Sequence, residues 1–248
     1  MNNIQDEFIS TVSHELRTPL TSIRGFSQTL LSSWDKLDEE SKKKFVKIIE
    51  EQSNRLINLV ENILTVSEIN GKKQVLKSVN VNVSIEKIVQ LLSQKYKEHN
   101  IITKFTSNLP TACLDDDKFQ QIITNLIDNA CKYSKTGSTV EIKTAFKDSD
   151  NILISIKDEG VGIESADLDK IFNKFVRLEN YLTSKTQGNG LGLYITKKLI
   201  ESMNGKIYVE SEINKGTTFN LEFAFYNHEE AMKCSLQSWL LIKEKNFL

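Results

Sequence analysis

One short segment near the start of the chain places a nucleophile beside an acid. In the run His14-Glu15-Leu16-Arg17-Thr18-Pro19-Leu20 an imidazole is followed directly by a carboxylate, and a hydroxyl comes one helical turn later. Apolar residues around this run recur every three or four positions, which predicts an amphipathic helix. His14 lies two positions from both Val12 and Leu16, so we expect it to point away from the apolar stripe into solvent. An exposed imidazole beside a carboxylate can accept a transferred group.

A second set of polar side chains recurs every four residues further along the chain. Gln121, Asn125 and Asn129 therefore share one face of a predicted helix, and Lys132 and Tyr133 follow at its end. Amide oxygens of Asn125 and Asn129 suit a Mg²⁺ ion that is bound mainly by phosphate oxygens. Lys132 and Tyr133 are placed to reach phosphate. Taken alone, a solvated row of asparagines is the more ordinary interpretation.

Two glycine-rich runs follow this helix. In Asp158-Glu159-Gly160-Val161-Gly162-Ile163 the carboxylate can accept from the 6-amino group of adenine, whereas guanine would present an acceptor there. Gly188-Asn189-Gly190-Leu191-Gly192-Leu193 precedes the last predicted helix, whose N-terminus attracts anions. The alternative is a dinucleotide fingerprint, but the glycine spacing and the order of elements differ from it. The two runs together predict a site for ATP.

A polar segment joins Phe175 to Gly188 and carries Arg177 and Lys185. We interpret it as a lid whose cations reach the γ-phosphate, although a plain surface loop is the alternative if the flanking runs are ignored. Beyond the last helix, the run Lys215-Gly216-Thr217-Thr218-Phe219 closes the set, and Thr218 is its candidate nucleotide contact.

The elements that position these groups fall into two sets. Two long amphipathic helices, about residues 9–30 and 38–69, predict a hairpin, and two copies of it would form a four-helix bundle. Further on we expect a helix capped by Ser84 and reaching about residue 98, followed by a strand and a helix that begins at Asp115 or Asp116. That strand covers residues 101–106 and that helix 115–133. They are followed by strands 139–146 and 151–157, helix 190–203, and strands 206–212 and 217–225.

These elements predict an α+β fold, in which a two-layer α/β sandwich follows the hairpin. The boundaries we assign are 1–70 for the hairpin, 71–78 for a linker, 79–226 for the sandwich and 227–248 for a tail whose role the sequence does not indicate.

Composition excludes several classes of protein. The net charge of −1 over 248 residues gives no global field for nucleic acid or an acidic membrane surface. No signal peptide and no apolar run long enough to span a membrane is present, so we expect a cytoplasmic chain without membrane contact of its own. The three cysteines are odd in number and widely spaced, which favours reduced thiols.

From Phe8 to about Phe225 these runs, in this order, resemble the sensor histidine kinases of two-component systems. The resemblance implies a Bergerat-type ATPase domain of the kind shared with gyrase and Hsp90, binding ATP and Mg²⁺. It also implies a homodimer that autophosphorylates and passes the phosphoryl group to an aspartate of a response regulator. His14 would be the phosphoacceptor, Glu15 the general base and Thr18 the residue for phosphatase activity. The implied nucleotide contacts are Asn125, Asn129, Lys132, Tyr133, Asp158, Gly160, Gly162, Ile163, Phe175, Arg177, Lys185, Gly188, Gly190, Leu191, Gly192, Leu193 and Thr218, with Asn125 and Asn129 as metal ligands.

Two other functions compete with this interpretation. One is a phosphatase or scaffold that binds ATP only to set its conformation, and the other is an ATPase that remodels a partner protein. Intact His14, Asn129 and Asp158 argue against the first, and the helical hairpin argues against the second.

Overall fold

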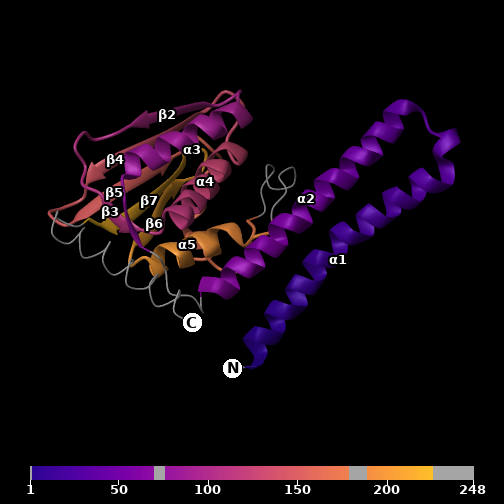
Figure 1. Cartoon of the computed structure of the whole chain (residues 1–248), viewed down its shortest axis with the longest axis horizontal. Coiled ribbons are helices and arrows are strands. Elements are labelled where there is room, and N and C mark those ends of the chain that lie inside the picture. The colour runs from indigo at the N-terminus through magenta and orange to yellow at the C-terminus, as the bar shows by residue number, and fades with distance from the viewer. Residues whose placement is uncertain (1, 70–75, 179–188, 226–248) are drawn as a thin grey trace, which may run out of the picture. The chain divides into compact units, whose positions relative to one another are not determined.

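The computed structural model describes residues 2–69, 76–178 and 189–225, and the chain divides into two compact units, Met1–Glu68 and Ile69–Leu248 (Figure 1). The first is a helical hairpin and the second is an α/β sheet domain. This confirms the predicted fold class.

The hairpin consists of two long helices, α1 (Asn2–Ser33) and α2 (Glu39–Ile69), joined through the short 3₁₀ helix η1 (Trp34–Lys36). Asp38 begins α2 by accepting a hydrogen bond from the Ser41 amide at 2.6 Å, which satisfies a backbone donor at the helix start. Helix α1 continues through Pro19. Between the helices, the rings of Phe26 and Phe45 pack with centroids 5.1 Å apart.

The second unit is built on a five-stranded sheet in the order β2-β4-β5-β7-β6. Strands β2 and β4 are parallel, and the other neighbours in the sheet are antiparallel. Helices α3, α4 and α5 pack against the sheet (Figure 1). In chain order the elements are β1 (Lys77–Val79), α3 (Val81–Lys95), β2 (Asn100–Lys104), β3 (Ala112–Leu114), α4 (Asp116–Lys132), β4 (Thr139–Phe146), β5 (Asn151–Lys157), η2 (Ser165–Asp167), α5 (Gly192–Ser202), β6 (Lys206–Glu212) and β7 (Gly216–Ala224).

The core of this unit lies between the sheet and its helices. Alternate residues of the central strands are buried, as in β5, where Ile152, Ile154 and Ile156 are each at most 1% exposed. Helix α4 supplies the opposing apolar face, and its Phe119 packs edge-on against Phe223 of β7 with centroids 5.9 Å apart. The polar face of α4 is thereby fixed relative to the ends of the strands.

The structure differs from two local expectations and contains one feature that was not expected. Asn80 caps α3 by accepting from the Val83 amide at 3.2 Å, whereas Ser84 is buried within the helix and donates to Asp116 at 3.0 Å, so the prediction of a Ser84 cap was wrong. Strand β1 pairs antiparallel with β3 in a small second sheet that the sequence pattern did not reveal. Cys113 is disulfide-bonded, which corrects the expectation of reduced thiols, while Cys131 is free and buried.

Candidate functional site

The first part of the site lies on α1. His14 and Thr18 are exposed, one helical turn apart, and the Thr18 hydroxyl donates to the His14 carbonyl at 3.3 Å. Glu15 is half-buried, because it faces the second helix of the hairpin. There Arg55 of α2 donates from Nη2 to Glu15 Oε2 at 3.0 Å. The structure therefore presents the imidazole to solvent and restrains the neighbouring carboxylate.

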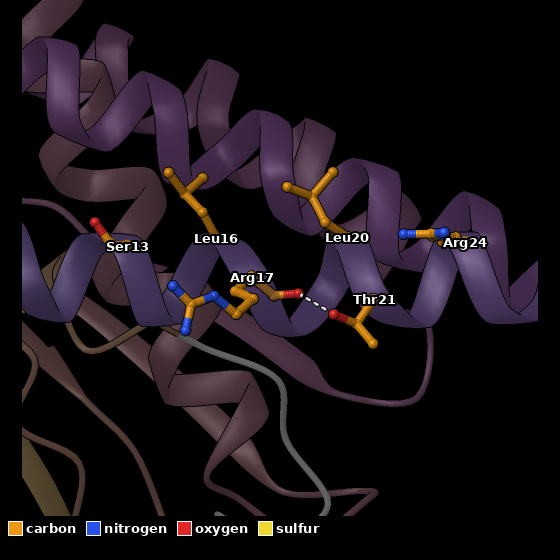
Figure 2. A pocket seen from close by; sticks show the side chains of 6 residues that line it. All are labelled: Ser13, Leu16, Arg17, Leu20, Thr21 and Arg24. Carbon is orange, nitrogen blue, oxygen red and sulfur yellow. Dashed lines mark hydrogen bonds between the residues drawn. The ribbon is translucent and has the colours of Figure 1, made fainter.

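A shallow groove of about 340 Å³ lies beside His14 on the same helix (Figure 2). Its apolar lining comes from Leu16 and Leu20, and Leu20 is 53% exposed. Arg17 and Arg24 lie along it, and the Thr21 hydroxyl donates to the Arg17 carbonyl at 2.8 Å. Ser13 completes the lining. The groove thus combines apolar side chains with two guanidinium groups.

The second part of the site surrounds Asp158, directly after β5. Its Oδ1 accepts from the backbone amides of Gly160 at 2.8 Å and Thr217 at 3.0 Å. The residue is 5% exposed, and this burial raises the pKa of the Asp158 carboxyl to about 6, although the two amides oppose the change. Both bonds go to Oδ1, so Oδ2 is the oxygen available to a ligand that offers an N–H group.

Close backbone contacts bring three of the motif runs to this carboxylate. Gly216 has φ of +100°, and a Cβ there would lie 2.0 Å from the Asp158 carbonyl oxygen, so only glycine fits. The Tyr133 carbonyl at the end of α4 accepts from the Val161 amide at 3.1 Å. The glycine run after β5, the closing run on β7 and the end of α4 therefore form one cradle. Ile163 is held in it through its amide, which donates to the Ser211 hydroxyl at 2.8 Å.

Helices α4 and α5 meet at the asparagine row. The Asn125 amide donates from Nδ2 to Thr196 Oγ1 at 2.8 Å, so its Oδ1 remains the free acceptor of that side chain. A Cβ on Gly192 would lie 2.7 Å from this oxygen, which explains why glycine begins α5. Asn129 is half-buried one turn along the same face. Two amide oxygens fit a Mg²⁺ ion that takes most of its ligands from phosphate. The described residues contain no cluster of three acidic, histidine or cysteine side chains that could hold a metal ion.

Two phenylalanines, Phe172 and Phe175, hold the segment that leads to residue 178. Phe172 is buried and packs edge-on against Phe219 with centroids 6.4 Å apart. Phe175 adopts φ of +61°, and its amide donates to the Gly190 carbonyl at 2.9 Å. This bond joins Phe175, where the predicted lid begins, to Gly190, two residues beyond its predicted end. Arg177 is exposed, whereas Lys185 and Gly188 lie outside the described residues.

The remaining predicted contacts lie at the start of α5, on β7, in the first glycine run and at the end of α4. Leu191 is fully buried, and Leu193 is half-buried in the first turn of α5. Thr218 lies on β7 between Lys157 of β5 and Glu210 of β6. Gly162 lies in the glycine run, with φ of +73°. Tyr133 is half-buried at the end of α4.

Sequence reasoning missed two partners of predicted site residues. Lys132 forms an ion pair with Asp128, one turn earlier on α4, and this i,i+4 spacing could have revealed the pair. Arg55 carries no such signal, because 40 residues separate it from Glu15.

Among the described helices, none is long and apolar enough to cross a membrane.

Comparison with known families identifies both units. Residues 4–72 match the His Kinase A (phospho-acceptor) domain. Residues 114–227 match the family described as histidine kinase-, DNA gyrase B-, and HSP90-like ATPase. The first match covers the helix that carries His14, and the second covers the cradle around Asp158.

Individual relatives agree with this assignment. The signal transduction histidine-protein kinase ArlS of Staphylococcus aureus is 36% identical over 223 residues, which are 89% of this chain and 49% of ArlS. The chain therefore spans about half the length of the curated relatives it matches. Full-length ShkA, solved with AMPPNP, has a TM-score of 0.65 at 28% identity over 89% of this chain and 46% of ShkA. The histidine kinase ThkA, solved in complex with the response regulator protein TrrA, shares the fold, with a TM-score of 0.70 at 22% identity over 89% of this chain and 61% of ThkA.

Proposed function

Because the chain belongs to the sensor histidine kinases, we propose that it phosphorylates itself on His14 with ATP and donates the phosphoryl group to a response regulator. The observation that carries this proposal is the exposure of His14 on the phosphoacceptor hairpin, beside a carboxylate that the fold holds in place. An acceptor must be accessible, because the donor site belongs to the other unit of the chain.

The reaction is a transfer of the γ-phosphoryl group to a ring nitrogen of His14. The N–P bond forms as the bond from phosphorus to the β,γ-bridging oxygen breaks, and ADP leaves. The imidazole must lose the proton on its other nitrogen, and Glu15 is the base that takes it. The hydrogen bond from Arg55 limits the orientations available to this carboxylate.

Asp158 selects the nucleotide. Its Oδ2 would accept from the 6-amino group of adenine, which guanine lacks, so ATP is preferred over GTP. The glycine run that follows would let the backbone approach the ring, and the amides at the start of α5 would bind the phosphates. Lys132, Tyr133 and Arg177 would supply polar contacts to the phosphates, together with Lys185 and Gly188.

Asn125 and Asn129 would hold Mg²⁺ through their amide oxygens. When bound, the ion neutralises charge on the phosphates and so favours departure of ADP. The hydrogen bond from Asn125 Nδ2 to Thr196 would leave Oδ1 as the atom that binds the ion. Two neutral ligands add no negative charge beside the nucleotide.

The partner that receives the phosphoryl group would be an aspartate in a receiver domain. Thr18 would then position water to remove that aspartyl phosphate, which makes the protein bifunctional. Thr18→Ala should slow dephosphorylation of a labelled receiver and leave autophosphorylation intact. Thr21→Ala is the matched control, because its hydroxyl makes the same type of bond to the carbonyl one turn earlier. Equal loss of phosphatase activity in both variants would contradict this role for Thr18.

The hairpin supports a homodimer. Large apolar side chains remain exposed on both helices, among them Leu20 at 53% on α1 and Leu64 at 57% on α2. Burying them against a second hairpin completes a four-helix bundle.

Incubation with γ-labelled ATP and Mg²⁺ tests the kinase activity. We expect the protein to retain a label that is labile in acid and stable in alkali. The label should disappear in His14→Gln and persist in His228→Gln, the matched control. An acid-stable label, or one retained by His14→Gln, would overturn the assignment of His14 as acceptor.

A further inference from the structure

Asp128 of α4 accepts hydrogen bonds from three side chains. Its Oδ1 accepts from Lys95 Nζ at 2.7 Å and from the Tyr96 hydroxyl, while its Oδ2 pairs with Lys132 Nζ. The Asp128 side chain is only 15% exposed. Two of the three partners are ammonium groups, and together the three donors compensate the burial of a negatively charged carboxylate.

Lys132 lies between this carboxylate and the predicted nucleotide site. On a helix with 100° per residue, Lys132 falls between Asp128 on one side and the Asn125 and Asn129 face on the other. Its side chain is 36% exposed and is directed to Asp128. The same ammonium group cannot pair fully with Asp128 and with a nucleotide phosphate, so the two anions compete for it.

Asp128 does not depend on Lys132 alone. If Lys132 turns toward a phosphate, Lys95 and Tyr96 still donate to Oδ1, and both come from the end of α3 rather than from α4. The cost of releasing Lys132 is thereby limited, because a buried carboxylate left without partners would be strongly destabilising.

We propose that Asp128 is a positioning residue that holds Lys132 in the absence of nucleotide and sets how tightly the domain binds nucleotide phosphates. This rests on the proposed function, in which Lys132 contacts phosphate. Asp128 itself contacts no substrate and acts through Lys132. Removing its charge should release Lys132 and strengthen the binding of nucleotides that carry phosphate, with no change for adenosine.

Calorimetric titration with Mg·ATP and with adenosine tests the proposal on the full chain. Asp128→Asn keeps an acceptor oxygen for Tyr96 and Lys95 and removes the charge. We expect the dissociation constant for Mg·ATP to fall by roughly two- to fivefold, the scale of a partly exposed ion pair, and that for adenosine to stay constant. Asp117→Asn is the matched control. It makes the same charge change on an exposed residue of α4, about 16 Å further along the helix axis. It should have no effect.

The gain in Asp128→Asn must depend on Lys132. In a Lys132→Met background the Asp128→Asn substitution should leave Mg·ATP affinity unchanged, because the ammonium group that it releases is absent. An equal gain in both backgrounds would overturn the proposal, since it would indicate a general field effect. Unchanged or weaker Mg·ATP binding in Asp128→Asn would also overturn it.

A second variant tests the same competition if Asp128→Asn folds poorly. Lys95→Met leaves Lys132 as the remaining ammonium partner of Asp128, so Asp128 should hold Lys132 more strongly. Mg·ATP binding should then weaken by about twofold when Lys132 is present and stay unchanged when Lys132 is replaced by Met. An equal effect in both backgrounds would contradict the proposal. A wild-type chain that binds neither Mg·ATP nor adenosine would instead contradict the proposed function on which it rests.

Discussion

The hairpin and the sheet domain differ in how many of their apolar side chains they bury within one chain. Among the described side chains of the hairpin, Pro19, Leu30 and Leu59 are the buried ones, and several large apolar residues of both helices stay exposed. The sheet domain buries whole faces of its strands and of α4 within one chain. The difference supports the proposal that the first unit completes its core against a second copy, whereas the second unit buries its core within one chain.

The reactive groups follow the same division. His14 is exposed, as the proposed role of phosphoacceptor requires. Asp158 is buried, and its pKa is raised to about 6 by that burial. The sheet domain therefore holds its candidate reactive group in the protein interior, whereas the hairpin presents its own to solvent.

The largest expected effect comes from truncating the core of the sheet domain. Leu126→Ala removes a fully buried side chain of α4 and should lower the free energy of unfolding by about 2–5 kcal/mol, independently of protein concentration. Urea denaturation measures this loss. Leu91→Ala, on an α3 residue that is 69% exposed, is the control and should change it little. Equal effects of the two substitutions would break the comparison.

Asp158→Asn should stabilise the sheet domain and abolish nucleotide binding. The raised pKa means that the folded state binds a proton more tightly than the unfolded state. The contribution of this carboxyl is therefore favourable below pH 4 and is lost as the pH rises through 6. At pH 7.5 the free energy of unfolding of the variant should exceed that of the wild type by about 1–3 kcal/mol. This difference should vanish near pH 4. Thermal unfolding of both proteins between pH 4 and pH 7.5 measures this difference. A difference that grew toward acid pH would contradict the account.

In the hairpin we expect substitution of an exposed apolar residue to affect self-association. Leu20→Asn removes an apolar side chain that a single chain leaves in solvent, so it should weaken self-association by about tenfold without unfolding the sheet domain. Sedimentation equilibrium measures the dissociation constant. Leu91→Asn makes the same change on an exposed residue of the sheet domain and should leave association unaltered. A dimer indifferent to Leu20→Asn would remove this residue from the interface.

The smallest effect on stability is expected at the contact between Arg55 and Glu15. The pair is partly exposed, so Arg55→Met should cost at most about 1 kcal/mol. Its effect should appear in the rate of autophosphorylation, which should fall at unchanged KM for ATP, because the carboxylate loses its restraint. Lys47→Met, also on α2, is the control. A rise in KM with an unchanged rate would contradict a positioning role for Arg55.

Local patterns predicted most of this structure. The spacing of apolar residues gave both long helices and α4, and the glycine runs were placed correctly at strand and helix ends because their backbone demands are local. Contacts between distant segments escaped prediction. The pairing of β1 with β3, the bond between Arg55 and Glu15, and the reach of Lys95 and Tyr96 to Asp128 all depend on how elements pack. Asn80 and Ser84 are both of residue types that commonly cap helices. Asn80 is the cap because α3 begins at Val81, directly after it.

The proposed acceptor and the proposed nucleotide site belong to separate units of the chain. Measuring Mg·ATP affinity and covalent labelling on the same preparation of His14→Gln tests these two assignments most directly. We predict a dissociation constant equal to that of the wild type and no protein-bound phosphate. Loss of ATP binding in this variant, or label retained on it, would contradict the account.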